Sequence, residues 1–356
     1  MRADLDQPGD APLVVVTGDF LGDRVADALA VAGCEVARGP VPVPRSRRPV
    51  LDEADWPRLL PRAAAIVVSP RDACPREMLL AAPLLRGVVS TVIGVDTIDM
   101  PTAEELGLLV GYGAMPENYL GVAEATVMFI TALSLEARRK ERMLASGEPF
   151  QPTMFGHLVT GRTVGLIGFG RIGRAVAERL TGWGVEILAF DPYAETDRAG
   201  TVTMVDLPTL LRRSDFVSLH TTLDASTTHL IGRSELATMK RTAYLINTAR
   251  GALVDEEALI EALERHVIAG AALDVFEHEP LDPESPLRRL DNVILTPHMI
   301  GHSDELLDAI GRVAAENTLR LIAGRPPLYV NNPDVMEAWR ERLASLPEPA
   351  RVPPVM

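Results

Sequence analysis

The sequence predicts an α/β protein of two lobes, in which short buried strands alternate with amphipathic helices. The chain has 356 residues, which is more than one hydrophobic core usually serves, so about two domains are expected. Short β-branched apolar runs recur between helical stretches, as in parallel sheets with crossover helices. A glycine-rich turn at residues 165–173 lies almost in the middle of the chain, which indicates that a complete lobe precedes it.

The composition is that of a compact globular protein, with 47% hydrophobic and 24% charged residues. A formal net charge of −14 argues against nucleic acid or an acidic membrane surface as partner. The two cysteines, Cys34 and Cys74, are too few for a disulfide framework and lack metal-ligand spacing. No run approaches the ~18 apolar residues of a bilayer span, and the amino terminus lacks an apolar signal segment. We therefore expect a cytoplasmic protein with buried cysteines and no metal.

The first lobe begins with a β-α unit. Residues 12–18 (PLVVVTG) form a β-branched run closed by glycine, and residues 21–31 have the apolar spacing of an amphipathic helix. Further strands are expected at residues 65–68, 88–92 and 108–110. This alternation predicts a parallel sheet with crossover helices.

The second lobe follows a long helical stretch. Apolar residues recur at helical spacing from Asn118 to Ser146, which predicts one long helix. The strands expected after it are at residues 163–167, 186–190, 216–219, 243–246, 270–273 and 293–295. Six such runs suit a doubly wound nucleotide-binding sheet.

Beyond His302 the chain changes character. Residues 304–323 return to helical periodicity, whereas the proline-rich segments at 326–333 and 347–354 predict an extended tail.

The glycine turn has the setting of a dinucleotide site. A buried-strand pattern precedes Gly168, and a helix pattern begins at Ile172. Gly168 permits a tight turn, Gly170 lets the backbone approach a pyrophosphate, and Gly173 allows close packing of the helix on the strand. Asp191 ends the next strand, where a carboxylate bonds a ribose diol and repels a 2′-phosphate. The turn therefore predicts NAD rather than NADP.

Polar residues follow three later strands, where an open α/β sheet has its ligand crevice. They include Arg250, Glu279 and His298. Taken singly, each has a common structural explanation: a helix cap or salt bridge, a surface charge, or a satisfied loop histidine. Together they suit reduction of a 2-keto acid, because a guanidinium can pair with the carboxylate while a carboxylate-supported imidazole transfers the proton.

From about Gly87 to Pro333 the chain resembles the D-isomer-specific 2-hydroxyacid dehydrogenases, which include phosphoglycerate, glycerate, hydroxypyruvate and D-lactate enzymes. The motifs that carry the resemblance are IGVDTID (93–99), Asn118 with VAE (122–124), GLIGFGRIG (165–173), INTARG (246–251), GAALDVF (270–276) with Glu279-Pro280, and LTPH (295–298).

The resemblance implies roles for individual residues. Arg250 would bind and polarise the substrate, Glu279 would support the histidine, and His298 would be the general acid and base, with hydride moving to or from the nicotinamide. The expected NAD contacts are Gly168, Gly170, Arg171, Ile172, Gly173, Asp191, His220, Thr221, Thr227, Thr248, Asp274, His298 and Gly301. The expected substrate contacts are Arg71, Val92, Ile93, Gly94, Asn118 and Arg250. Three nearby polar residues are interpreted as loop or helix-start residues: Glu277, His278 and His302.

The sequence also departs from the family pattern. Val92 stands where many relatives have glycine, Thr222 replaces a frequent proline, and Ala125 takes the place of a frequent histidine. These changes leave dehydrogenase activity plausible but weaken any prediction of one particular substrate.

The implied fold is two Rossmann-like or flavodoxin-like α/β domains, with the NAD domain inserted into a discontinuous substrate domain. We expect the substrate domain at 1–125 and 300–333, the NAD domain at 126–299, and a tail at 334–356. The segment 118–146 resembles the one through which relatives pair, which predicts a homodimer.

Two other functions stay open at this point. An NAD-sensing binding protein, similar to corepressors of this fold, would bind NAD without significant turnover. Formate dehydrogenase is a weaker alternative, because glutamine usually stands at the position of Glu279.

Overall fold

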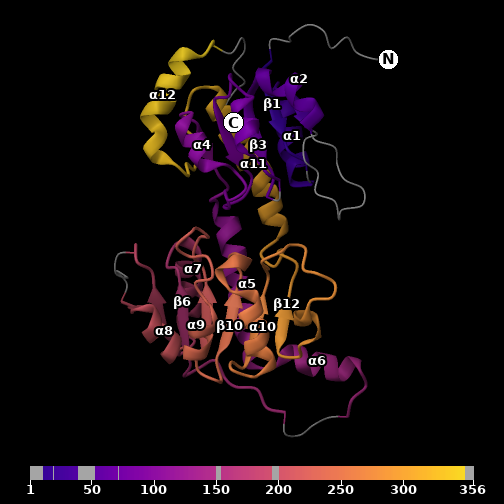
Figure 1. Cartoon of the computed structure of the whole chain (residues 1–356), viewed down its shortest axis with the longest axis vertical. Coiled ribbons are helices and arrows are strands. Elements are labelled where there is room, and N and C mark those ends of the chain that lie inside the picture. Colours follow the sequence, from indigo (N-terminus) through magenta and orange to yellow (C-terminus); the bar gives the residue numbers. More distant parts are fainter. Residues whose placement is uncertain are drawn as a thin grey trace. The chain divides into compact units, whose positions relative to one another are not determined.

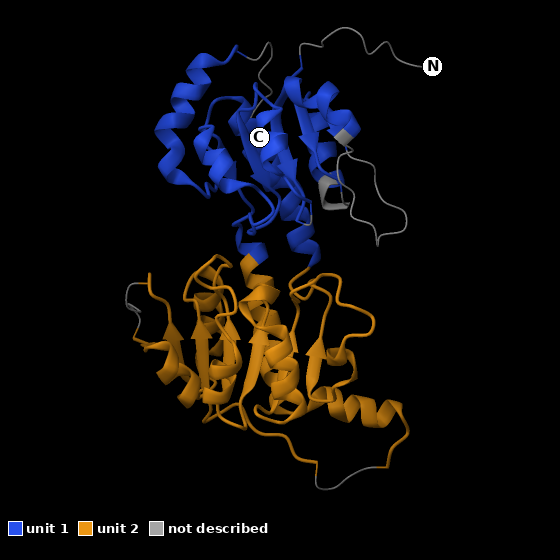
Figure 2. Ribbon diagram, in the orientation of Figure 1, with its two compact units in different colours: residues 1–118, 303–356 blue, residues 119–302 orange. Residues whose placement is uncertain are grey.

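The chain folds into two compact units (Figure 2). Unit 1 comprises Met1–Asn118 and Ser303–Met356, and unit 2 comprises Tyr119–His302. The computed structural model describes residues 11–18, 20–38, 53–70, 72–149, 154–194 and 200–348. The first unit is thus built from both ends of the chain. The predicted first boundary, after Ala125, lies inside a helix, seven residues beyond the observed one.

Unit 1 contains a parallel sheet, five-stranded within the described residues, in the order β2-β1-β3-β4-β5. Its neighbouring strands β1 and β3 are labelled in Figure 1. Its strands are β1 (Leu13–Val16), β2 (Glu35–Arg38), β3 (Ala63–Val68), β4 (Gly87–Ser90) and β5 (Leu109–Gly111). Its helices are α1 (Phe20–Val31), α2 (Trp56–Leu59), α3 (Arg76–Leu80), α4 (Met100–Glu105), α11 (Asp304–Ile322) and α12 (Met336–Ser345). This strand order is the flavodoxin-like one.

Both faces of the unit 1 sheet are buried, which explains its continuous apolar strands. Val14 points into the cluster that contains Val25 of α1 and Val313 of α11. Its neighbour Val15 points to the opposite face, into the cluster with Met78 of α3. Helices therefore cover the sheet on both sides.

Unit 2 contains a larger parallel sheet, seven-stranded in the part of the unit that the structure describes, in the order β12-β11-β10-β9-β6-β7-β8. Its strands are β6 (Thr163–Ile167), β7 (Glu186–Phe190), β8 (Thr203–Met204), β9 (Phe216–Leu219), β10 (Tyr244–Asn247), β11 (Gly270–Leu273) and β12 (Val293–Leu295). Its helices are α5 (Pro116–Ser134, which begins in unit 1), α6 (Ala137–Ala145), α7 (Arg171–Leu180), α8 (Leu207–Arg213), α9 (Arg233–Thr238) and α10 (Glu256–Glu264). The order is that of a Rossmann sheet with one more strand.

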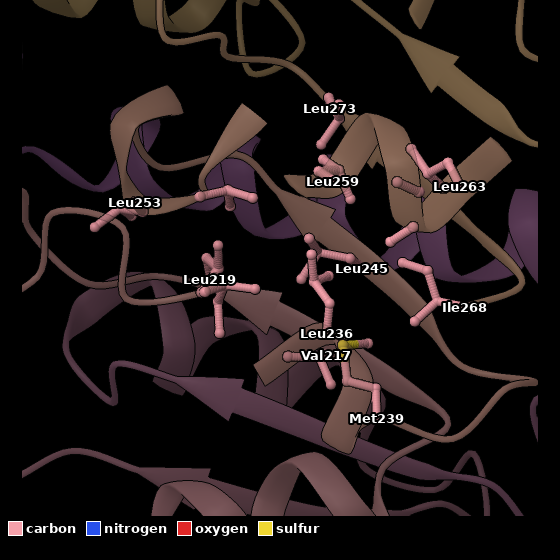
Figure 3. Close-up of a cluster of buried hydrophobic side chains, with 14 of the residues drawn as sticks. Val217, Leu219, Leu236, Met239, Leu245, Leu253, Leu259, Leu263, Ile268 and Leu273 are labelled. Carbon is pink, nitrogen blue, oxygen red and sulfur yellow. The ribbon is translucent and has the colours of Figure 1, made fainter. Parts of the chain in front are cut away.

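The core of unit 2 also lies on both faces of its sheet. Figure 3 shows one face, where Leu245 of β10 packs with Leu236 of α9 and Leu259 of α10. The next residue, Ile246, belongs to the other face, with Phe129 of α5. The predicted fold class is therefore confirmed, although the sequence did not indicate the short strands β2 and β8.

The predicted long helix at residues 118–146 is wrong in one respect, because it is two helices bent by 66°. In a continuous helix the Ser134 carbonyl would accept from Arg138 N. Here it accepts from His157 N (2.6 Å), and the Ser134 hydroxyl donates to the His157 carbonyl (2.8 Å). Glu136 then adopts a left-handed conformation (φ 53°), and α6 starts in a new direction.

The predicted tail at 334–356 is also wrong over part of its length, because α12 lies within it. Trp339 is 1% exposed and its indole N–H donates to the Arg86 carbonyl (2.6 Å). Arg342 donates to the Leu85 carbonyl (2.8 Å). The apolar spacing of Met336, Trp339 and Leu343 forms the helix face that covers the unit 1 core.

Both cysteines are free and buried, as predicted. Burial raises the pKa of Cys34 to about 11 and that of Cys74 to about 12, so neither thiol ionises readily. Across the described parts of the chain, no single helix is both long and apolar enough to cross a membrane.

The buried indole of Trp339 leads to a stability prediction. Trp339→Ala should lower the free energy of unfolding by about 3–5 kcal/mol, because it leaves a cavity and an unpaired carbonyl. Urea unfolding measures this loss. Arg340→Ala, on the exposed side of the same helix, is the control and should change stability by less than about 0.5 kcal/mol. Equal stability of the two variants would contradict the packing role of α12.

Candidate active site

The predicted site residues of unit 2 follow the carboxyl ends of its parallel strands, which share one edge of the sheet. The glycine turn follows β6, Asp191 follows β7, His220 follows β9, Arg250 follows β10, Asp274 and Glu279 follow β11, and His298 follows β12. The strand order changes direction at β6, whose neighbours are β7 and β9. Such a switch point is where open α/β sheets bind ligands.

The glycine turn fits a pyrophosphate. Gly168 has φ 93°, and a Cβ there would lie 2.6 Å from the His220 carbonyl carbon. A Cβ at Gly173 would lie 2.3 Å from the Gly168 carbonyl oxygen. At Gly170, by contrast, a Cβ would have no heavy atom of the described residues within 4 Å, and no side chain caps α7 there. Open space above uncapped helix amides is what a phosphate requires.

Asp191 is held in place by backbone amides. Its Oδ2 accepts from Phe169 N (2.8 Å), and its Oδ1 accepts from Tyr193 N (2.9 Å) and Ala194 N (3.1 Å). Each carboxylate oxygen can accept more than one bond, so the group can still receive ribose hydroxyls. The same carboxylate connects the β7 loop to the glycine turn.

His220 is an uncharged histidine. Burial lowers its pKa from 6.5 to about 3, and its Nε2 lies 2.9 Å from Ser218 Oγ. The Thr221 amide adjoins the glycine turn, 2.6 Å from the position of a Cβ at Gly168. These residues therefore shape the wall beside the turn without adding charge.

The remaining residues predicted to contact NAD form hydrogen bonds or pack against other residues of the protein. Thr248 lies 3.4 Å from Thr126, hydroxyl to hydroxyl, and the Thr227 hydroxyl donates to the Thr222 carbonyl (2.8 Å). Gly301 packs so closely on α5 that a Cβ would lie 2.8 Å from Val122 Cγ2. At the start of α7, Arg171 is exposed and Ile172 packs partly buried on the core. Their roles toward NAD stay predictions.

Arg250 lies in a turn that Asn247 stabilises. The buried Asn247 amide donates to the Arg250 carbonyl (2.8 Å), and its oxygen accepts from Ala249 N (3.0 Å). Arg250 Nη1 donates to the Ala249 carbonyl (2.7 Å). This hydrogen bond holds the guanidinium at the carboxyl end of β10, and the residue as a whole is partly exposed.

The structure brings His298 and Glu279 together. His298 Nδ1 lies 2.8 Å from Glu279 Oε2, and the two side chains are 38% and 24% exposed. The other carboxylate oxygen accepts from Phe276 N (3.2 Å). With Nδ1 facing the carboxylate, Nε2 is the imidazole nitrogen left for a substrate proton.

Asp274 organises the turn that carries His298. This buried carboxylate accepts from the Thr296 hydroxyl (2.6 Å) and from Met299 N (3.1 Å) and Ile300 N (3.3 Å). These bonds enclose His298, whose backbone is left-handed (φ 56°). Asp274 therefore fixes the turn from which the imidazole projects, besides its predicted contact with NAD.

The predicted substrate contacts in unit 1 make contacts within that unit. Val92 packs its side chain on the unit 1 core, and Ser90 Oγ donates to the Gly94 carbonyl (2.7 Å). The Asn118 amide donates to the Gly113 carbonyl (3.1 Å). Arg71 lies outside the described residues. The substrate role of these residues, with Ile93 between Val92 and Gly94, stays a prediction.

Sequence reasoning missed the partners of Glu277. It was interpreted as a polar loop residue, but its carboxylate lies 2.7 Å from His229 Nε2 and accepts from Glu256 N (3.3 Å). His278 and His302 are exposed, as expected for loop and helix-start residues. No local sequence signal indicates these contacts, because His229 and Glu256 lie in other segments of the chain.

A cavity of about 520 Å³ in unit 2 lies away from this chemistry. It is lined by residues at the amino ends of strands, including Tyr244, Ala269 and Val293, and by none of the predicted site residues. Within the described ranges, no group of three or more His, Cys, Asp or Glu side chains could hold a metal ion.

The comparisons with known proteins agree with the geometry. Residues 127–300 match the family model "D-isomer specific 2-hydroxyacid dehydrogenase, NAD binding domain". A glyoxylate reductase of Thermofilum pendens is 38% identical over 81% of this chain and 89% of its own length. A D-3-phosphoglycerate dehydrogenase of Methanocaldococcus jannaschii is 36% identical over 80% of this chain and 54% of its own length.

A solved structure is also similar. The D-lactate dehydrogenase of Aquifex aeolicus, in complex with NAD and lactic acid, has a TM-score of 0.76 at 27% identity, covering 91% of this chain and 98% of its own. These relatives are named as enzymes, which gives no support to the NAD-sensing alternative.

The low pKa of His220 leads to a pH prediction. The unfolded chain binds a proton at this histidine near pH 6.5, whereas the folded chain binds it only near pH 3, so stability is lost as pH falls below about 6.5. Between about pH 7 and about pH 5 this loss should amount to about 2 kcal/mol. His220→Gln should lack that part of the pH dependence. Urea unfolding at both pH values measures it, and equal pH slopes in parent and variant would contradict the burial of a neutral imidazole.

Proposed function

Since the chain belongs to the D-isomer-specific 2-hydroxyacid dehydrogenase family, we propose that His298 and Glu279 form the acid–base pair of its reaction. As a member of this family, the protein is an NAD-dependent oxidoreductase that interconverts a D-2-hydroxy acid and its 2-keto acid. The observation that supports the assignment is the 2.8 Å contact between His298 Nδ1 and Glu279 Oε2, formed between loops from two neighbouring strands.

In the reductive direction His298 acts as the acid. The protonated imidazole donates from Nε2 to the keto oxygen, and Glu279 stabilises the imidazolium and keeps its Nδ1–H directed toward itself. In the oxidative direction the neutral imidazole accepts the hydroxyl proton at the same nitrogen. When bound, NADH would supply the hydride in the reductive direction and NAD⁺ would accept it in the oxidative direction.

Arg250 binds the substrate and polarises it. A guanidinium can pair with a carboxylate through two parallel hydrogen bonds, which orients a 2-keto acid and leaves positive charge near its carbonyl oxygen. The Asn247 amide supports this role because it holds the Arg250 turn through the main chain. Arg250 thus stabilises the negative charge that develops on the oxygen before His298 protonates it.

We propose that the substrate is a small unphosphorylated 2-keto acid, such as glyoxylate. The relative named glyoxylate reductase matches this chain over 89% of its own length, whereas the phosphoglycerate dehydrogenase relative matches over 54%. The greater match in length favours the first class of substrate.

We further propose that the protein is a homodimer that pairs through α6 and the segment after it. Large apolar side chains of this part of unit 2 are exposed, among them Leu144 (81%), Phe155 (75%) and Leu158 (74%). Met128 and Leu135, in and just after α5, are about half exposed as well. Exposed apolar side chains close together in one segment are typical of a protein interface.

The activity prediction uses loss of NADH absorbance with a panel of 2-keto acids. The parent should turn over glyoxylate and hydroxypyruvate with higher kcat/KM than phosphohydroxypyruvate. His298→Gln should lower kcat by about 10²- to 10⁴-fold, because it removes the proton donor. Arg250→Lys should raise KM and lower kcat, because an ammonium cannot form the paired bonds.

His266→Gln is the matched control, since that histidine is exposed and lies before β11, at the amino edge of the sheet. It should behave as the parent does. Parental rates in the His298 and Arg250 variants would contradict the assigned roles. Tight NADH binding without turnover of any 2-keto acid would instead favour an NAD-sensing protein.

The dimer prediction is tested by sedimentation. The parent should sediment as a dimer, and a Leu144→Lys/Phe155→Lys variant should shift toward the monomer, because two charges would be buried at the interface. Val31→Lys changes an equally exposed apolar residue of unit 1 (89% exposed) and should leave the dimer intact. A monomeric parent would contradict the proposal.

A further inference from the structure

A backbone amide in the loop that carries Glu279 donates a hydrogen bond to the Glu279 carboxylate. Glu279 Oε1 accepts from Phe276 N (3.2 Å), so the direction of this carboxylate depends on the backbone of Phe276 and hence on the Phe276–Glu277 peptide that follows that residue. That peptide lies directly against the turn after Arg250. A Cβ at Gly251 would lie 1.9 Å from the Phe276 carbonyl carbon and 2.4 Å from Glu277 N. The loops of Arg250 and Glu279 therefore share one rigid contact.

Glu277 closes this contact from the other side. Its amide donates to Glu256 Oε2 (3.1 Å), and its own Oε1 accepts from Glu256 N (3.3 Å). Glu256 is the first residue of α10. This reciprocal pair fastens the Glu277 peptide to the start of a helix whose Leu259 is buried in the core.

His229 provides the third attachment. Its Nε2 lies 2.7 Å from Glu277 Oε1, the same oxygen that accepts from Glu256 N. The His229 amide donates to the Ala252 carbonyl (2.8 Å), and Ile231 pairs with Val254 in an isolated bridge. His229 is thus fixed to the segment that follows Arg250, in a left-handed backbone conformation (φ 52°).

Two carboxylates, those of Glu256 and Glu277, lie together in this cluster. Burial raises the pKa of the Glu256 carboxyl and the negative charge of Glu277 adds to that rise, whereas the hydrogen bond from the Glu277 amide and the nearby His278 lower it. Two carboxylates in one partly buried cluster repel each other. His229 Nε2 faces the Glu277 carboxylate and can donate a hydrogen bond to it, from a side chain that is 49% exposed.

We infer that Glu277, held by Glu256 and His229, is a positioning residue that keeps Glu279 directed at His298. The inference rests on the proposed function, because it concerns the same acid–base pair. Glu277 acts through the Phe276–Glu277 peptide and has no contact with the reacting atoms in this account. The clamp of Glu277, Glu256 and His229 transmits the rigidity of α10 to the Glu279 carboxylate.

The test is the pH dependence of kcat for 2-keto acid reduction in Glu277→Ala. This variant removes the carboxylate that binds Glu256 N and His229 but keeps the bond from the residue 277 amide to Glu256 Oε2. The weakened clamp should lower kcat by about 10- to 100-fold, with KM changed by less than about threefold, because misdirection of Glu279 affects the transition state more than binding. The basic limb of the profile should move to lower pH by roughly one unit, since a less well supported imidazolium loses its proton sooner. The affinity for NADH, measured by fluorescence, should not change.

His229 variants keep the inference testable if Glu277→Ala folds poorly. His229→Ala should lower kcat and move the limb in the same direction, whereas His229→Gln should retain most of the activity because its amide can still donate to Glu277. In the double variant the two effects should not add, because both residues act through one contact. Glu257→Ala, an exposed neighbour in the first turn of α10, is the control and should match the parent.

Two results overturn the inference alone: a Glu277→Ala variant with the parental kcat and pH limb, or a fall in kcat without movement of the limb, which would indicate general destabilisation. A parent protein that reduces no 2-keto acid overturns the proposed function and the inference with it.

Discussion

The proposed chemistry of this protein depends on one hydrogen bond between two loops, that of His298 Nδ1 with Glu279 Oε2. The loops leave β11 and β12, neighbouring parallel strands whose carboxyl ends share one edge of the sheet. Parallel pairing therefore brings the two side chains near each other, but a bond of 2.8 Å also requires each loop to hold its shape. The residues around His298 and Glu279 hold the two loops in shape.

Carboxylates that receive backbone amides hold these loops. Asp191 accepts from Phe169 N, Asp274 from Met299 N, Glu279 from Phe276 N, and Glu277 from Glu256 N. Each acid thus stabilises a stretch of main chain beside the glycine turn, Arg250 or His298. Hydrogen bonds to charged groups are stronger than those between neutral ones, so a few of them can order loops that have little apolar surface. Gly168 and Gly251 contribute by allowing backbone segments to touch.

Sequence reasoning predicted the two α/β units and the strands of unit 2 because buried parallel strands have a distinctive apolar pattern. It placed Arg250, Glu279 and His298 at strand ends, and their motifs identified the family. It missed the break near Glu136 because the Ser134 carbonyl bonds a residue far along the chain, which local periodicity cannot show. It missed α12 because flanking prolines outweighed one short helical face. It undervalued Glu277 because the partners of that residue, His229 and Glu256, come from segments that only the fold brings together.

The most direct test of the account is the pH dependence of kcat for 2-keto acid reduction with NADH in the parent and in Glu279→Gln. Glutamine keeps the shape and a hydrogen-bonding oxygen but loses the charge that stabilises the imidazolium. The account predicts a lower kcat and a basic limb moved to lower pH in the variant. A limb at the same pH as in the parent, with kcat unchanged, would contradict the central claim that His298 transfers the proton with the support of Glu279.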